Sequence, residues 1–342
     1  MLELLNILPP DEKAAKEAKE RLDAAAKPKG SLGELENIII KLAALTGSAD
    51  IDISKKAVVT VSADNGAVKH GISSAPSEIT ARMTKYIAEN RTAVGIMAKG
   101  AGADAISVDM GMFNDIGHER VINRRIANGT NDMTVMPAMT EEQAEKAIKT
   151  GIELVGQLKD DGYRLIATGE MGIGNTTAAS AVISVLMGKA PEEVTGRGAG
   201  LDDEGLKLKI SAIKKAIEVN KPDKNDAAGV IAKVGSFDIA GMCGMFLGGA
   251  LYRIPVIADG FISSAAALAA KHICEKSAAA MIASHLSKEP ASAMVLDELG
   301  LKPIIHAEMR LGEGTGAAAL MPILDMAVSV YKNIITMKEL MT

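Results

Sequence analysis

The sequence is poor in aromatic side chains: it has no Trp, four Tyr and four Phe among 342 residues. Proteins that hold single-stranded nucleic acid stack its bases on aromatic rings, so a surface of that kind is not expected here. The charge agrees, because 43 acidic residues exceed 38 basic ones, the net charge is −5, and no basic block occurs. The composition therefore argues against a nucleic-acid partner.

Cysteine, clustered histidine and long apolar runs are also lacking. Cys243 and Cys274 lie in apolar helical stretches without CxxC or metal-ligand spacing, which predicts buried free thiols in a reducing compartment. The five histidines are scattered and form no HExxH motif, so no metal site is expected. No apolar run reaches membrane-spanning length, and residues 1–5 are too short and too acidic for a signal peptide. We expect a cytoplasmic protein without membrane contact.

The hydrophobic residues, 48% of the chain, are numerous enough for a large core. Four apolar runs have strand character, at 57–62, 105–108, 164–167 and 254–258. Helical periodicity occurs between them, for example at 79–98, 140–158, 176–187 and 203–219. This alternation predicts the α/β class, with right-handed crossovers and a mainly parallel sheet.

Helical patterns also flank the α/β region. Residues 11–27 and 35–45 read as helices before the first strand, and Ser31 and Glu34 have capping-box spacing ahead of the second. The stretch 316–341 is apolar on one face. We expect it to pack back over the core, close to the N-terminal helices.

Acidic residues follow or end the predicted strands, in Asp64-Asn-Gly66, Asp109-Met-Gly111, Glu170-Met-Gly172 and Asp259-Gly260. Ligands of open α/β sheets bind in the crevice outside the carboxyl ends of the strands. Four carboxylates at this edge therefore predict a polar ligand there.

Two glycine-rich loops suggest an anion site. Gly169 to Thr177 follows a strand and opens a helix, so its backbone N–H groups, with Asn175 and Thr176, favour an anion. The alternative is a tight turn with a Thr cap, and both the P-loop lysine and the Rossmann spacing are missing. In the second loop, Gly196 to Asp203, Arg197 suits a phosphate or carboxylate, or else is a solvated charge beside an Asp202 cap. Together the loops and acids suggest a sugar phosphate.

A glutamate between glycines is the strongest candidate for catalysis. Glu313 lies in Arg310-Leu-Gly-Glu-Gly-Thr-Gly316, just before the C-terminal helical pattern. Glycines allow a sharp turn and close approach of a ligand, which suits a general base. The alternative is a helix start in which the carboxylate only complements the helix dipole.

These motifs resemble those of the nicotinate-nucleotide:dimethylbenzimidazole phosphoribosyltransferase family, over about residues 20–335. They occur in the expected order at 27–33, 62–66, 169–177, 196–203, 259–262 and 310–316. The resemblance implies a Rossmann-like sheet with helices on both faces, forming a large nucleotide-binding domain over 51–316. It also implies a small helical domain built from 1–50 and 317–342, and a homodimer or a heterodimer with a paralogous subunit.

The resemblance implies transfer of phosphoribose from nicotinate mononucleotide to an aromatic acceptor, with release of nicotinate and inversion at the anomeric carbon. Glu313 matches the family's general base and Glu170 a second active-site acid. No metal or cofactor is implied. The residues that match nucleotide contacts are Gly172, Ile173, Asn175, Thr176, Gly196, Arg197, Gly198, Lys209, Asp259 and Ser287. Those on the acceptor side are Ser73, Ala81 and Leu311.

The chain departs from the family pattern at Asn65, Ala81 and Leu286, where members commonly have His, Gln and Arg. These departures leave the acceptor open among dimethylbenzimidazole, other benzimidazoles, purines and phenolic compounds. They also motivate two alternatives: a non-catalytic paralogous subunit that completes a partner's site, and a different enzyme that binds a sugar phosphate.

Overall fold

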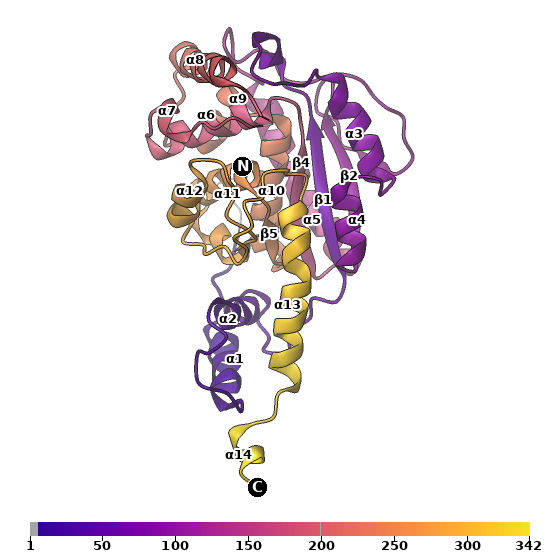
Figure 1. Cartoon of the computed structure of the whole chain (residues 1–342), viewed down its shortest axis with the longest axis vertical. Helices are drawn as coiled ribbons and strands as arrows, with labels where there is room; N and C mark the ends of the chain where they lie inside the picture. The colour runs from indigo at the N-terminus through magenta and orange to yellow at the C-terminus, as the bar shows by residue number, and fades with distance from the viewer. Residues whose placement is uncertain (1–5, 199) are drawn as a thin grey trace.

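The computed structural model describes residues 6–198 and 200–342, so the interpretation of residues 1–5 lies outside the described residues. Its centre is a six-stranded parallel sheet with the order β3-β2-β1-β4-β5-β6 (Figure 1). The strands are β1 Lys56–Ala63, β2 Ala103–Gly111, β3 Val121–Asn123, β4 Leu165–Met171, β5 Val256–Ala258 and β6 Met281–Ala283. This order confirms the predicted Rossmann-like α/β class. The sequence reading missed β3 and β6, because three-residue strands at a sheet edge carry too little periodicity.

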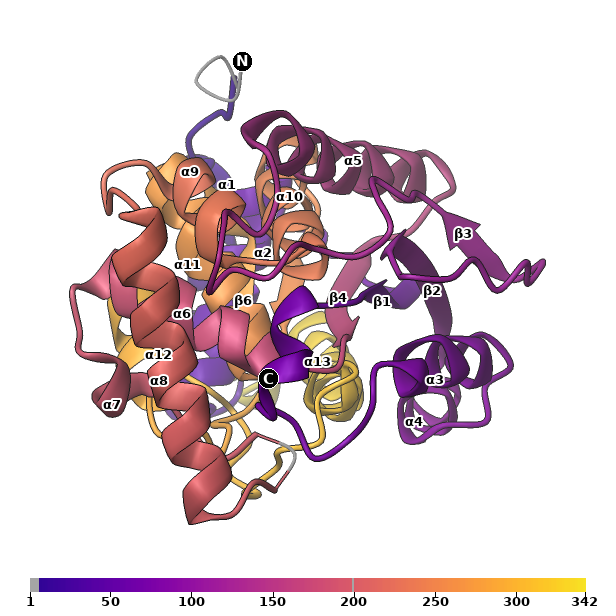
Figure 2. The same cartoon turned by 90° about the horizontal axis from the view of Figure 1, so that it is seen from above.

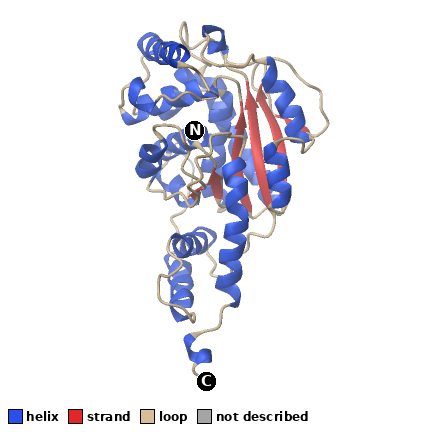
Figure 3. Ribbon diagram, in the orientation of Figure 1, coloured by secondary structure: helices blue, strands red, loops and turns tan. Residues whose placement is uncertain are grey.

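Alternating side chains divide the core between the two faces of the sheet. In β1, Ala57, Val59 and Val61 enter one hydrophobic cluster and Val58 enters the other. Figure 2 shows helices on both sides, and Figure 3 separates them from the strands by colour. One face carries α5 Glu141–Asp160 and α10 Phe237–Tyr252, and the other α3 Glu78–Ala88, α4 Ala93–Gly100 and α13 Thr315–Asn333. The prediction of helices on both faces is confirmed.

The predicted single helix over 79–98 is wrong. The chain ends α3 at Ala88, turns at Asn90, whose φ is 57°, and starts α4 after Thr92. Asn tolerates the left-handed conformation better than most residues, and Thr favours the position before a helix. The break places Thr92 and the start of α4 beside the cleft described below.

Further helices surround the β4–β6 half of the sheet. They are α6 Asn175–Met187, α7 Pro191–Val194, α8 Asp203–Asn220, α9 Ala227–Val234, α11 Phe261–Ile273 and α12 Ser292–Leu299, with 3-10 turns at Gly66–His70 and Glu275–Ala280. Asp202 caps α8 by accepting the Gly205 N–H at 2.8 Å. Cys243 and Cys274 are free thiols, the first buried as predicted and the second only half-buried. In the part of the chain that the structure describes, no helix is long and apolar enough to cross a membrane.

The terminal helices gather beyond one end of the sheet (Figure 1). They are α1 Glu12–Ala24, α2 Glu34–Thr46 and α14 Met337–Leu340, beside the second half of α13. Tyr331 of α13 is buried and donates its hydroxyl to Ala49 O at 2.8 Å. The predicted capping box is wrong, because Gly33 is the cap residue and Glu36 instead accepts the Leu32 N–H. The division of the chain into a small and a large domain stays a prediction.

Helices α5 and α10 pack backbone to backbone at two glycines. A Cβ at Gly151 would lie 2.0 Å from Gly241 O, and one at Gly244 would lie 1.9 Å from Ile148 O. Real Cβ atoms do not approach backbone so closely. The two helices that cover this face of the sheet therefore require glycine at both positions.

We predict that Gly244→Ala lowers the free energy of unfolding by about 1–3 kcal/mol, because the added methyl group must push the two backbones apart. Thermal denaturation measures the loss. Gly100→Ala is the matched control: it lies at the end of α4 with nothing within 4 Å of its Cβ position. Equal melting temperatures for the two variants would contradict the packing argument.

Candidate active site

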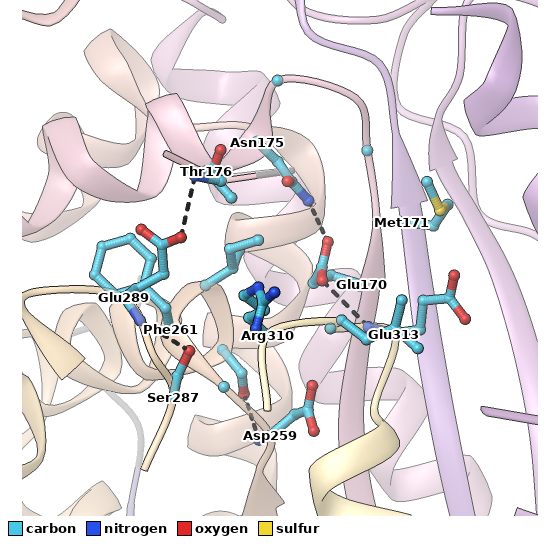
Figure 4. Close-up of a pocket in the computed structure, with 18 of the residues that line it drawn as sticks. Glu170, Met171, Asn175, Thr176, Asp259, Phe261, Ser287, Glu289, Arg310 and Glu313 are labelled. Atoms are coloured by element: carbon cyan, nitrogen blue, oxygen red, sulfur yellow. Dashed lines mark hydrogen bonds between the residues drawn. The ribbon is translucent and has the colours of Figure 1, made fainter. Parts of the chain in front are cut away.

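A cleft opens at the carboxyl ends of β4, β5 and β6, beside the point between β1 and β4 where the strand order reverses. It contains about 920 Å³ of empty space, including its open mouth. Most of the predicted site residues line it: Ser73, Glu170, Gly172, Ile173, Asn175, Thr176, Arg197, Gly198, Asp259, Ser287, Leu311 and Glu313. Gly196, Lys209 and Ala81 are not in its wall. In Figure 4, Thr176 and Glu289 lie toward one end and Glu313 and Met171 toward the other.

Glu170, the penultimate residue of strand β4, forms a buried pair of carboxylates with Asp238. Asn175, the first residue of α6, donates its side-chain amide to Glu170 Oε2 and, at 2.7 Å, to Asp238 Oδ2. Burial raises the pKa of Glu170 well above its usual value, the charge of Asp238 adds to the rise, and the Asn175 hydrogen bond opposes it. The site therefore favours a Glu170 that keeps its proton. Sequence reasoning missed Asp238, which follows Ser236 at the start of α10 like an ordinary first-turn acid.

The backbone around Glu313 is left-handed at three consecutive residues. Gly312, Glu313 and Gly314 have φ values of 82°, 64° and 100°. Glycine adopts this conformation freely, whereas for a glutamate it is uncommon and costs energy, a pattern that clusters at functional sites. The loop must therefore be held in place by its surroundings.

Neighbouring strands hold that loop. The Glu313 N–H donates to Glu170 Oε1 at 3.3 Å, and its carbonyl accepts the Thr60 hydroxyl at 3.1 Å. The approach requires glycine at position 169, where a Cβ would lie 2.2 Å from Glu313 O. Glu313 is thus seated between β1 and β4.

Asp259 fixes the other side of the loop. Its carboxylate accepts the N–H groups of Gly314 at 3.1 Å and Ala317 at 3.0 Å, and so caps α13. Burial raises the pKa of Asp259, while the positive charge of His285 and these backbone donors oppose the rise. Although Asp259 lines the cleft, both carboxylate oxygens serve the helix start, and its predicted nucleotide contact stays a prediction.

The Glu313 side chain lies between two cavities. The residue is 7% exposed. Burial raises the pKa of its carboxyl group, and the charge of Asp259 adds to this rise, whereas the Val94 N–H of α4 opposes it. Within residues 6–198 and 200–342, its Oε2 has no hydrogen-bond partner. The second cavity, of about 590 Å³, is lined by Met83, Tyr86, Arg91, Thr92, Ala93, Leu311 and Glu313. Glu313 and Leu311 are therefore common to both cavity walls.

At the opposite end of the first cleft, a lysine side chain lies buried behind the residues of the wall. Lys209, fully buried, donates to Thr176 Oγ1 at 2.9 Å, and burial lowers the pKa of its ammonium to about 8 while Glu289 opposes the shift. Glu289 also accepts the Gly198 N–H at 3.1 Å. A Cβ at Gly196 would lie 1.9 Å from Glu289 Oε2, so that glycine packs on the carboxylate. Glu289 was missed as a site residue, although Ser287, two positions before it, was among the predicted nucleotide contacts.

The remaining predicted residues are placed as follows. The Arg197 guanidinium is half exposed and pairs with Asp203, which resembles the alternative of a solvated charge beside the Asp202 cap. Arg197 nevertheless lines the cleft. Asn65 donates its side-chain amide to Ile173 O at 3.2 Å, so this departure from the family pattern supports the glycine loop. Ala81, on α3, lines neither cavity, whereas Met83 on the same helix lines the second.

Comparison with known proteins adds independent evidence. Residues 7–340 match a family model described as "Phosphoribosyltransferase". The nicotinate-nucleotide–dimethylbenzimidazole phosphoribosyltransferase of Acetivibrio thermocellus is 49% identical, over 93% of this chain and 91% of that protein. The enzyme of the same name from Clostridium tetani is 44% identical, over 98% and 93%.

A solved structure agrees. The crystal structure of CobT from Thermus thermophilus has a TM-score of 0.92 and 35% identity, and the match covers 96% of this chain and 99% of that one. Sequence and structure thus match over nearly the whole length. The chain belongs to the nicotinate-nucleotide–dimethylbenzimidazole phosphoribosyltransferase family.

Proposed function

We propose that this enzyme transfers phosphoribose from nicotinate mononucleotide to an aromatic base, with Glu313 as general base. The observation that carries the proposal is the position of Glu313 in the walls of two cavities. The first, with its glycine loops and its buried lysine, suits a nucleotide. The second, between α3, α4 and Leu311, suits a flat acceptor.

The proposed chemistry needs a base more than an acid. In nicotinate mononucleotide the ring nitrogen is cationic, so it leaves as a neutral ring when the bond from C1′ breaks and the electron pair moves onto nitrogen. The acceptor's lone pair forms the new bond to C1′ from the opposite face, and its N–H or O–H proton passes to Glu313. We propose that Glu170, whose pKa burial raises well above its usual value, hydrogen-bonds the ribose.

The nucleotide end follows from the same geometry. The glycine loop of residues 172–174 leads into the N-terminus of α6, and Thr176 lines the cleft with its hydroxyl bonded to Lys209. We propose that these groups and Arg197 hold the phosphate, as helix N-termini and cations commonly do. Gly172, Ile173, Asn175, Gly196, Gly198, Asp259 and Ser287 complete the proposed nucleotide side.

The acceptor is dimethylbenzimidazole or an alternative such as a phenolic compound. Two relatives carry dimethylbenzimidazole in their names. We propose that Leu311, Ser73 and the α3 segment that carries Ala81 bound the acceptor side, with Met83 in the wall. The non-catalytic alternative has no support from the relatives.

We also propose a cytoplasmic dimer, with the same chain or a paralogue. Large apolar side chains are exposed along α13 and α14, namely Met326, Val330, Met337 and Leu340. Exposed apolar patches of this kind mark protein interfaces. Sedimentation equilibrium of the purified chain should give twice the monomer mass, and a monomer at all concentrations would contradict the homodimer.

Replacing Glu313 by Gln should lower kcat about 10²–10⁴-fold, because the amide cannot accept the acceptor's proton. Nicotinate release, followed by chromatography, measures the loss. Nicotinate mononucleotide should still raise the melting temperature of the variant, since its own contacts remain. The matched control is Glu308→Gln, an exposed glutamate that pairs with Lys288. If the chain is active only together with a partner subunit, undiminished turnover of that assembly with Glu313→Gln would favour the structural-subunit alternative, and undiminished turnover of the chain alone would refute Glu313 as the base.

The rate should fall on both sides of neutral pH. Burial raises the pKa of Glu313 above 4.5, so the carboxylate protonates and kcat/KM falls as the pH drops through that raised value. Lys209, with a pKa of about 8, loses its charge above that pH, so the KM for nicotinate mononucleotide should rise there. The residual activity of Glu313→Gln should lack the acid limb, and an unchanged acid limb would refute the assignment.

A further inference from the structure

Thr92 occupies the N-cap position of α4, but its side chain makes no capping hydrogen bond. It precedes Ala93, the first residue of α4, and its φ and ψ of −104° and 172° are those of a cap residue. A threonine there normally accepts the N–H of the second or third helical residue. Thr92 makes no such bond, and the second residue, Val94, interacts instead with the Glu313 carboxylate.

The Thr92 hydroxyl is buried and is not used in capping. The residue is 8% exposed, and its Oγ1 has no hydrogen-bond partner among the residues that the structure describes, 6–198 and 200–342. A buried polar atom without a partner is costly, and in a native protein it calls for an explanation such as a missing ligand. Thr92 lies in the wall of the cavity that also contains Glu313.

Two unpartnered oxygens therefore belong to one cavity wall. Glu313 Oε2 comes from the C-terminal loop and Thr92 Oγ1 from the start of α4. The Val94 N–H, which a cap hydroxyl could accept, interacts with the Glu313 carboxylate. A single ligand that bonds to both oxygens needs two polar groups.

The other residues that line this cavity indicate which kind of ligand fits it. Met83, Ala93 and Leu311 supply apolar surface, which suits flat aromatic faces. Tyr86 and Arg91 also line this cavity, and the Arg91 guanidinium lies 4.9 Å from the Tyr86 ring centroid. A guanidinium attracts the electron-rich face of an aromatic ring.

We propose that Thr92 is a specificity-determining residue that hydrogen-bonds a polar substituent of the aromatic acceptor, while the reacting N–H or O–H of the same acceptor faces Glu313. The inference rests on the proposed function and names the acceptor class: an aromatic base with a hydroxyl, amino or second ring-nitrogen group on its outer edge. An acceptor whose outer edge carries only methyl groups leaves the Thr92 hydroxyl unsatisfied.

Thr92→Val tests this in the full-length protein, because it removes the hydroxyl and keeps the shape. Nicotinate release is measured with dimethylbenzimidazole and with a hydroxyl-substituted benzimidazole. The kcat/KM ratio of the hydroxylated to the methylated acceptor should fall about threefold to tenfold, the effect of one neutral hydrogen bond, chiefly through the KM for the hydroxylated compound. Thr92→Ser should restore the ratio.

The matched control is Thr150→Val, on α5 and outside both cavity walls, whose hydroxyl bonds only to Lys146 O. It should leave the acceptor ratio unchanged. A ratio that is also unchanged in Thr92→Val, whether both rates fall together or neither falls, overturns the proposal. If Thr92→Val melts well below the wild type, Thr92→Ala and Thr92→Ser give the same comparison.

Calorimetric titration of both benzimidazoles into the protein with nicotinate mononucleotide separates the two levels of inference. Thr92-dependent binding of the hydroxylated compound without nicotinate release would overturn the proposed function and support the role of Thr92. Release of nicotinate with a ratio independent of Thr92 would do the reverse. A wild-type chain that binds neither compound would overturn both.

Discussion

The active-site architecture depends on one capping interaction, that of Asp259 with the start of α13. Its carboxylate binds the N–H groups of Gly314 and Ala317, on either side of the point where the loop becomes a helix. This contact compensates the strain of three left-handed residues in succession. Asp259 directly follows β5, so its hydrogen bond to Gly314 fixes the position of the neighbouring Glu313 relative to the sheet.

Two buried glutamates in one cleft have different chemistry because their partners differ. Burial and the nearby Asp238 raise the pKa of Glu170, although a side-chain amide and a backbone N–H that donate to it oppose the rise. Glu313 has one backbone donor and one oxygen without a partner. A fully satisfied carboxyl is suited to holding a ligand, whereas an unsatisfied one is suited to accepting a proton.

Local sequence patterns were sufficient for four of the strands and the main loops, because the apolar run in β1 and the glycine spacing at 169–177 are properties of neighbouring residues. They failed at β3 and β6, which are too short, and within 79–98, where Asn90 and Thr92 outweigh a continuous apolar period. Asp238, Glu289 and Thr92 were missed for another reason. Asp238 and Glu289 become informative through hydrogen-bond partners far away in the chain, and Thr92 through the cavity that it shares with Glu313. Sequence spacing carries no record of such neighbours.

Helix α13 joins the cleft to the chain ends, and this has a mechanical consequence. Its 19 residues form a rod of about 28 Å, with Glu313 just before one end and Tyr331 bonded to the N-terminal segment near the other. Pro322 lies within it and cannot donate a backbone hydrogen bond, which gives the rod one compliant point. The helix is therefore a direct physical connection between the terminal helices and the loop that carries Glu313, with Pro322 between the two contacts.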